Sequence, residues 1–392
     1  MRGSTEGKKA TRVDVAVVGA GPVGLALAAE LRRLGVASVV VDKAVAGANT
    51  SRACVIHART LEVLQEMGAT RKLLEEGVKV PIFRIRDRDR SLVTIDFAEI
   101  DSAYPFTLMN PQDRTEAVLL EILEALGGTV DRPTEFLELE DVGAGVEVTV
   151  ASNGEKRSIS AHWLVGCDGM HSSVREQAGI AFEGAVYEQG FVLADVQMTW
   201  PLSREEVSLF YSPRGLVVVA PLPGDRFRIV ATDDDAPADP SLEYIQSLLE
   251  ERGPTDSHCE VHDMAWSSRF RIHHRVSTAP RKGRVLLCGD SAHVHSPAGG
   301  QGMNTGIQDA ISLADVLART LRTGDEAPLD RWARERHEVA RRVVETTDRM
   351  TRLATVKAPW AQSLRNAAVS FAGHLPPVRD AVARSLSEIN LR

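Results

Sequence analysis

Three glycines near the start of the chain, Gly19, Gly21 and Gly24, form a G-x-G-x-x-G pattern. The pattern follows a β-branched run at residues 13–18 and opens a stretch with helical periodicity. In such a turn the first glycine permits the tight bend, the second removes a Cβ where a pyrophosphate approaches the backbone, and the third lets the helix pack on the strand. The helix N-terminus then binds the phosphates. A turn that serves only packing is the alternative, which the strand-to-helix context disfavours.

Asp42 stands about 20 residues beyond these glycines, at the end of a second buried strand at residues 38–41. A carboxylate at that place can accept hydrogen bonds from the hydroxyl groups of a ribose. The two features together predict a dinucleotide site. They do not decide between NAD and FAD.

A second glycine-rich segment follows a buried strand at residues 285–288, near the other end of the chain. Asp290 at the carboxyl end of this strand can hold a polyol. The loop with Gly299, Gly300 and Gly302 can wrap a flat ring with its backbone, and the helix after it directs N–H groups and a positive dipole at developing negative charge. An isoalloxazine ring becomes anionic on reduction, whereas nicotinamide becomes neutral, so this segment favours FAD.

Residues 166–175 form a third segment of interest, in which Asp168 and Gly169 end a strand. Ser172 is placed to cap the short helix that carries Arg175. For Ser172 and Arg175, a structural role as cap and ion pair is as compatible with the pattern as direct contact with a ligand.

Residues 13–43, 166–175 and 281–309 resemble the three signature segments of the FAD-dependent aromatic hydroxylases, the class A flavoprotein monooxygenases typified by para-hydroxybenzoate hydroxylase. The motif PAGGQGMNTGIQDA is most similar to the phenol and polyketide hydroxylase branch. Members of that branch often carry a thioredoxin-like third domain. The helical tail after residue 350 is too short for one, so we expect it to be missing.

The resemblance implies that Asp290 bonds the ribityl chain, that Gln112 touches the same region, and that Arg52 neutralises the diphosphate or helps to bind the reductant. Pro297, Gly299 and Gly300 would supply the backbone environment of the reacting ring. The predicted cofactor-binding set is Gly19, Gly21, Pro22, Val23, Gly24, Asp42, Lys43, Arg52, Gln112, Asp168, Arg175, Asp290, Pro297, Gly300, Gly302, Met303 and Asn304.

The same resemblance implies a reaction. NADPH or NADH would reduce FAD, O2 would add to the flavin, and the resulting C4a-hydroperoxide would hydroxylate an aromatic or polyketide-like small molecule. A flavoprotein epoxidase, another FAD oxidoreductase or a non-catalytic FAD-fold carrier are the alternatives. A disulfide reductase is disfavoured, because the chain has neither a second G-x-G-x-x-G nor a C-x-x-C pair.

Composition restricts the partners. The chain has 392 residues and a net charge of −8. Its overall charge therefore creates no positive electrostatic field that would attract nucleic acid. The longest uncharged run, residues 15–29, is too short to span a bilayer as a helix, and no secretory signal precedes the first strand. Four widely spaced cysteines are typical of a reducing compartment. We expect a cytoplasmic monomer or homodimer without stable membrane association.

Histidines and arginines near the second glycine segment allow two further readings. His293 and His295 lack additional ligands at metal-binding spacing, so no metal ion is expected. A basic run leads to the glycine segment and is by default a solvated face, the alternative being a docking surface for NADPH phosphates. The run consists of Arg269, Arg271, Arg275, Arg281 and Arg284.

The elements that must position these residues predict an α/β fold. We expect a Rossmann-like FAD-binding domain, an inserted antiparallel-sheet substrate domain with a hairpin turn at residues 223–225, and a helical C-terminal tail. The FAD-binding domain would comprise residues 1–80, 101–182 and 281–350, the substrate domain residues 81–100 and 183–280, and the C-terminal helices residues 351–392.

Overall fold

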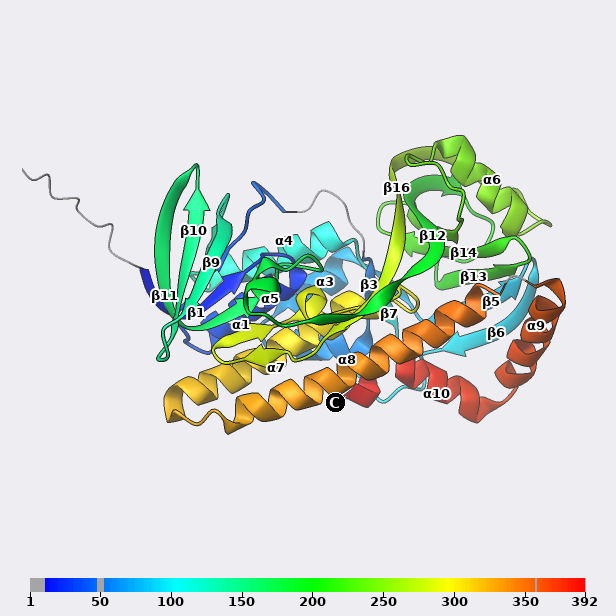
Figure 1. The fold of residues 1–392 in the computed structure, drawn as a ribbon. Helices are drawn as coiled ribbons and strands as arrows, with labels where there is room; N and C mark the ends of the chain where they lie inside the picture. The colour runs from blue at the N-terminus through cyan, green and yellow to red at the C-terminus, as the bar shows by residue number, and fades with distance from the viewer. Residues whose placement is uncertain (1–10, 48–52, 357, 392) are drawn as a thin grey trace, which may run out of the picture.

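Two eight-stranded β-sheets and a long C-terminal helix dominate the structure (Figure 1). The computed structural model describes residues 11–47, 53–356 and 358–391. Within these residues no helix is both long and apolar enough to cross a membrane. All four cysteines are free thiols.

Strand β1 (Thr11–Val18) lies inside the first sheet and pairs in parallel with β2 (Ser38–Val41) and β11 (Glu155–Gly166). Val17 and Val18 face two different apolar clusters, as expected for a parallel strand that is buried on both faces. The strand order is β17-β18-β11-β1-β2-β8, and β10 and β9 continue from β11. The remaining strands are β8 (Val130–Asp131), β9 (Glu135–Asp141), β10 (Val146–Ser152), β17 (Arg281–Lys282) and β18 (Val285–Leu287).

Helix α1 (Pro22–Arg33) packs between α4 (Gln112–Ala125) and α7 (Gln301–Thr323). Residues 24–31 of α1 are all buried because these neighbours cover every side of the helix. Pro22 occupies the first turn, where its missing N–H costs nothing. Helix α7 begins at Gln301, directly after the left-handed Gly300. Shorter helices are α2 (Ala58–Val63), α3 (Ala69–Glu76), α5 (Ser173–Gln177) and the 3-10 turn η1 (Gly289–Ser291).

The second sheet is built on two long antiparallel strands, β12 (Phe182–Thr199) and β16 (Glu260–Ser277). The hairpin predicted at residues 223–225 is confirmed, since Leu222 pairs with Arg226. One pair, β13 with β5, is parallel. The order is β19-β16-β12-β15-β14-β13-β5-β6, with β5 (Ile82–Asp87), β6 (Arg90–Asp96), β13 (Glu206–Ser212), β14 (Gly215–Leu222), β15 (Arg226–Thr232) and β19 (His293–Val294).

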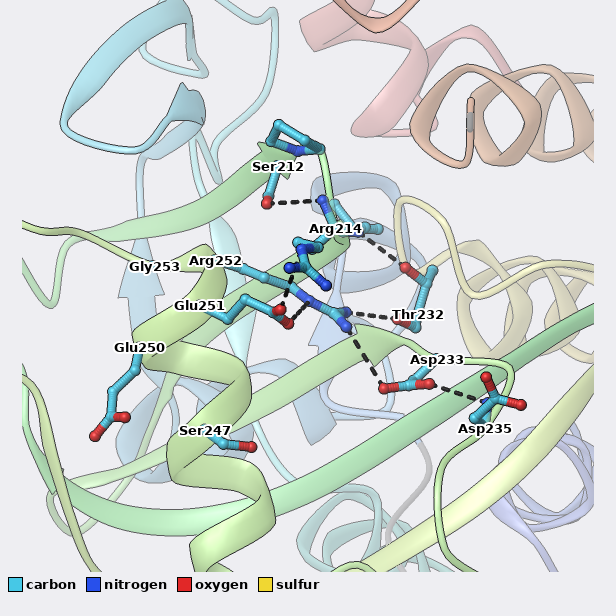
Figure 2. A network of polar contacts seen from close by, with 12 residues as sticks. Ser212, Arg214, Thr232, Asp233, Asp235, Ser247, Glu250, Glu251, Arg252 and Gly253 are labelled. Atoms are coloured by element: carbon cyan, nitrogen blue, oxygen red, sulfur yellow. Dashed lines mark hydrogen bonds and ion pairs between the residues drawn. The ribbon is translucent and has the colours of Figure 1, made fainter. Parts of the chain in front are cut away.

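Helix α6 (Leu242–Arg252) is fastened to the second sheet through its last residue. Figure 2 shows Arg252 among the polar groups that join the helix to the end of β15. The buried Arg252 guanidinium donates to the Thr232 carbonyl at 2.6 Å and lies 3.5 Å from Asp233 Oδ2. Tyr244 also donates its hydroxyl to Asp233, at 2.5 Å. Two partners of the Asp233 carboxylate therefore lie within α6, the helix that packs on the second sheet.

The C-terminal helices connect the two sheets. Helix α8 (Ala327–Ala354) contacts α7 as well as β16 and β19, and Figure 1 shows it running beneath both sheets. Helices α9 (Pro359–Gly373) and α10 (Pro376–Leu386) pack on β6, and the turn η2 (Ile389–Leu391) contacts α2. A third, small sheet contains β3 (Val55–Ile56), β7 (Thr107–Met109) and β4 (Val78–Val80). The predicted domain boundaries stay predictions. Strand β19 lies in the range assigned to the FAD-binding domain, yet it pairs with the second sheet.

Candidate cofactor site

In the first glycine turn, Gly19 and Gly24 are tightly packed, whereas the backbone of Gly21 borders open space. Gly19 has φ +101°, and a Cβ atom there would lie 2.3 Å from the Cys167 carbonyl oxygen. A Cβ on Gly24 would lie 1.9 Å from the Gly19 oxygen. Gly21 is the N-cap of α1, has no side chain capping it, and would place a Cβ in open space. The turn therefore leaves the N-terminus of α1 accessible, as a phosphate requires.

Asp42 is bound directly to this turn. Its Oδ2 accepts from the Ala20 N–H at 2.6 Å and its Oδ1 from the Ala44 N–H at 2.7 Å. Arg132 lies beside it, with Nη2 at 3.9 Å from Asp42 Oδ2 and at 3.0 Å from the Ala20 oxygen. The Arg132 Nε is buried and has no hydrogen-bond partner in the described ranges. No sequence motif marks Arg132; its one signal is its position directly after β8, which lies beside β2 in the sheet.

The second glycine segment forms a loop that ends in the N-terminus of α7; we call residues 297–303 the glycine loop. Gly299 and Gly300 have φ values of +79° and +66°, which an L side chain rarely adopts. A Cβ on Gly300 would also lie 2.6 Å from the Cβ of Val55 in β3. Gly300 caps α7 without a side-chain hydrogen bond, so the N–H groups of the first turn lack side-chain partners from the cap. Pro297 is exposed at the start of the loop.

Asn304 and His57 hold the glycine loop in shape. The Asn304 side chain accepts from the His57 N–H at 2.8 Å and donates to the Val55 and Gly300 oxygens at 2.8 and 2.7 Å. His57 Nε2 lies 2.7 Å from the Gly299 oxygen. Burial lowers the pKa of His57 to about 4, so a neutral ring donates to that carbonyl. The structure thus uses the Asn304 side chain within the protein, and any contact with a cofactor there comes from the backbone.

The first and second glycine segments meet at Val23. A Cβ on Gly289 would lie 2.9 Å from Val23 Cγ2, and one on Gly306 would lie 2.7 Å from the same atom. Asp290 follows Gly289 in η1 and is exposed. The exposed Asp290 carboxylate therefore stands next to the start of α1, at the carboxyl end of the sheet.

Three other predicted residues have structural partners. Gln112 accepts from the Ala53 N–H at 3.2 Å and donates to Glu116 at 2.9 Å. Arg175 is buried and donates to the oxygens of Ser291 and Met170 at 3.1 and 3.0 Å. The predicted helix cap is confirmed, since the Ser172 oxygen accepts from the Arg175 N–H at 2.9 Å.

Asp168, Lys43 and Arg52 also belong to the predicted set. Asp168 Oδ2 accepts from the Val174 N–H at 3.1 Å, while Oδ1 is buried and has no hydrogen-bond partner among the residues that the structure describes. Burial raises the pKa of Asp168, against hydrogen bonds that lower it. Lys43 is exposed next to Asp42. Arg52 lies outside the described residues.

A buried ion pair in the second sheet lies close to the glycine loop. Arg228 Nε and Nη2 bind the two oxygens of Asp195, each at 2.7 Å, and Trp266 Nε1 donates to Asp195 at 3.1 Å. Arg228 Nη1 is buried and has no hydrogen-bonded oxygen or nitrogen partner among the described residues, although the Cys54 thiol lies beside the guanidinium. Cys54, which precedes the Val55 that contacts the loop, is also beside Arg228; burial raises the pKa of its thiol, and the guanidinium opposes that rise. A charged residue inside the buried strand RFRIVAT was the signal that the sequence analysis passed over.

The histidines and arginines near the loop have defined partners. His293 Nε2 lies 2.7 Å from Asp309 Oδ2, and Arg336 binds the other oxygen of Asp309. Among the residues that the structure describes, no group of three or more His, Cys, Asp or Glu side chains could hold a metal ion.

The basic run extends over both sheets. Arg281 and Arg284 lie over the Trp163 ring and pair with Glu326, on the first sheet. Arg269 donates to the oxygens of Ala236 and Asp234, on the second sheet. The chain passes from one sheet to the other within the run, and a docking surface made of all five arginines stays a prediction.

These features fit an elongated, anionic dinucleotide. The open N-terminus of α1 suits a diphosphate, and Arg132, which binds the Ala20 oxygen of the same turn, supplies a cationic donor beside it. The two left-handed glycines at the start of α7 suit a flat ring that gains negative charge. Asp290 lies between these two places, where a polyol would run.

Residues 12–347 match the family model described as "FAD binding domain". The chain belongs to this family. The match covers both glycine segments and both sheets.

Two of the relatives that it resembles are monooxygenases by name. The chain is 37% identical over 374 residues to 6-methylpretetramide 4-monooxygenase of Streptomyces rimosus, covering 93% of this chain and 66% of that protein. It is 34% identical over 345 residues to pentachlorophenol 4-monooxygenase of Sphingobium chlorophenolicum, covering 86% and 64%. The chain thus spans just under two thirds of the length of these relatives. The solved structure of the OxyS anhydrotetracycline hydroxylase from Streptomyces rimosus has a TM-score of 0.82 at 32% identity, over 97% of this chain and 77% of that one.

Proposed function

We propose that this chain carries an FAD-dependent monooxygenase that uses NADPH or NADH and O2 to hydroxylate an aromatic or polyketide-like small molecule. The observation that carries the proposal is the packing of Val23, in the first glycine segment, against Gly289 and Gly306, which flank the glycine loop. The names of the relatives support the reaction class. In the overall balance NAD(P)H supplies two electrons, one oxygen atom enters the substrate, and the other leaves as water.

Each end of the site has a proposed role. The N–H groups beyond Gly21 bind the diphosphate, Asp42, Lys43 and Arg132 hold the adenosine end, and Asp290 binds the ribityl hydroxyls. When bound, FAD supplies the two-electron reduction and the activation of O2. The chain holds the ring with the backbone of Gly299, Gly300, Gly302 and Met303, and the N-terminus of α7 stabilises negative charge on it.

The substrate lies, in this proposal, between the glycine loop and the second sheet. Arg228 Nη1 supplies the polar anchor, because a buried guanidinium N–H with no oxygen or nitrogen partner among the described residues can donate to a phenolate or carbonyl oxygen. Asp195 and Trp266 fix the orientation of Arg228. The surrounding apolar residues keep water away from the reacting ring.

The test is turnover by the purified, FAD-loaded protein. NADPH or NADH oxidation and O2 uptake are followed with and without 6-methylpretetramide and simple phenols, and products are analysed by mass. The expected result is substrate-stimulated O2 uptake and a product heavier by one oxygen atom. Reduced protein that O2 does not reoxidise would reject a monooxygenase and favour a carrier of FAD, whereas an epoxide product would identify the epoxidase alternative.

Two further assignments belong to the same proposal. The four free thiols support a cytoplasmic location. A monomer or a homodimer is proposed, and light scattering of the purified protein distinguishes the two.

A further inference from the structure

Glu388 is a buried carboxyl group that forms no ion pair with any of the residues that the structure describes. The side chain is 1% exposed. One carboxyl oxygen lies 3.3 Å from Thr305 Oγ1, and the other contacts the side-chain amide of Gln308; both residues are in α7. A carboxylate at this position would accept hydrogen bonds only from uncharged groups, and burial would remove the water that stabilises its charge. A neutral carboxylic acid avoids this desolvation cost.

Gln308 supplies an independent reason for a proton at this position. Its Nε2 donates to Glu388 and, at 3.1 Å, to Thr60 Oγ1, while its Oε1 is buried and has no hydrogen-bond partner within the described part of the chain. A protonated Glu388 has an O–H that Gln308 Oε1 or Thr305 Oγ1 can accept. Burial also raises the pKa of Glu388 to about 8, in spite of the amide and hydroxyl contacts that lower it.

The residues next to Glu388 contact the glycine loop. We call residues 386–388 the C-terminal clasp. The Leu386 oxygen accepts from Gln301 Nε2 at 3.1 Å, and a Cβ on Gly299 would lie 3.0 Å from Leu386 Cδ2. The Ser387 oxygen accepts from the Arg59 N–H in α2 at 3.2 Å. The clasp therefore contacts both the glycine loop and α2, which follows the His57 that binds the Gly299 oxygen.

We propose that Glu388 is a positioning residue for the cofactor: as a neutral acid it anchors the C-terminal clasp to α7, and the clasp holds Gly299 and Gln301 in the shape that receives the flavin ring. Ionisation of Glu388 then weakens the clasp and loosens the glycine loop. The inference goes beyond the proposed reaction, but it rests on the proposed placement of FAD at this loop.

The direction of the pH effect follows from the other groups nearby. Glu388 has a higher pKa when the clasp is bound to α7 than when the clasp is detached. The clasp is therefore bound less strongly as pH rises from the ordinary pKa of a glutamate through about 8. His57 stays neutral over this range. Asp309 stays ionised, because Arg336 and His293 lower its pKa against burial. The charged groups that act on Glu388 from the adjoining helices are Arg336 on α8, which lowers its pKa, and Asp309 on α7, which raises it. Arg59 and Glu62 on α2 pair with each other.

The test measures FAD affinity of the apoprotein by quenching of flavin fluorescence between about pH 6 and about pH 9.5. The wild type is expected to lose about tenfold in affinity across this range. Glu388→Gln, which keeps a neutral side chain, should bind FAD with little pH dependence. Glu345→Gln, at an exposed position of α8, is the matched control and should follow the wild type. Equal pH profiles for Glu388→Gln and the wild type would overturn the inference.

Hydrogen exchange on the wild-type apoprotein keeps the test independent of the variant's folding. After correction for the intrinsic effect of pH, amides of residues 386–391 should lose protection as pH rises, whereas those of α1 should not. Protection of residues 386–391 that does not change with pH would also refute the role of Glu388. Wild-type protein that binds no FAD at any pH would instead reject the placement of the cofactor, which is a separate outcome.

Discussion

Val23 in the first turn of α1 lies against Gly306 in α7, so closely that a Cβ atom on Gly306 would approach Val23 Cγ2 to 2.7 Å. The two residues are far apart in the sequence, and each belongs to one of the two glycine segments. Their contact places the first glycine turn, which is the proposed phosphate site, and the glycine loop at one edge of the first sheet. The geometry of the whole cofactor site therefore depends on a small residue at position 306.

Gly306→Ala should destabilise the protein by about 1–3 kcal/mol, although alanine favours a helix more than glycine does. The new methyl group would meet both Val23 and the Cα of Gly289, 3.0 Å away. Urea unfolding measures the change. The double variant Val23→Ala/Gly306→Ala removes one clash and should recover part of the loss. A single variant as stable as the wild type would show that α1 and α7 are less tightly packed than described.

Gly21→Ala and Gly24→Ala should separate cofactor binding from folding. The Cβ at position 21 enters open space, so the fold should keep its stability while FAD affinity falls at least tenfold. The Cβ at position 24 meets the Gly19 oxygen at 1.9 Å, so that variant should not fold normally. Circular dichroism and flavin fluorescence check the pair. Unchanged FAD affinity in Gly21→Ala would mean that the phosphates bind elsewhere.

Asp195→Asn should cost about 3–5 kcal/mol, because it leaves Arg228 as a buried charge without a countercharge. The matched control is Glu75→Gln, which breaks the exposed pair with Arg71 and should leave stability almost unchanged. Replacing both partners, with Asp195→Leu and Arg228→Met, should recover much of the stability but lose the proposed substrate anchor. Denaturant unfolding of the four proteins, the wild type included, supplies the comparison. A small loss in Asp195→Asn, similar to that of the control, would contradict the buried pair.

The neutral His57 should make the fold sensitive to acid. Its folded pKa of about 4 lies below the ordinary value of 6.5, so the unfolded chain takes up the proton first. Stability should therefore fall as pH decreases from about 6.5 to about 4, by about 3 kcal/mol for this group. His57→Gln, which keeps an N–H donor, should flatten that slope, while the exposed His374→Gln should not. Unfolding free energies across this range measure it, and parallel slopes in all three proteins would disprove the assignment.

Local patterns were enough to predict the elements that carry the site. The phosphate turn, the hairpin at residues 223–225 and the Ser172 cap depend on residues a few positions apart, so their geometry follows from backbone preferences and short side-chain reach. The start of α7 also has a local cause, because two successive left-handed glycines let the helix begin directly after the loop.

The sequence by itself determined the fold class, the family and the two glycine segments, since these rest on periodicity and on residues that only a particular backbone tolerates. Only the tertiary structure decided which polar groups face the site. Asn304 binds Val55 and His57. Glu388, near the other end of the sequence from the first glycine turn, contacts α7 just beyond the glycine loop. Such partners depend on strand order and helix packing, which bring together residues whose spacing in the sequence carries no signal.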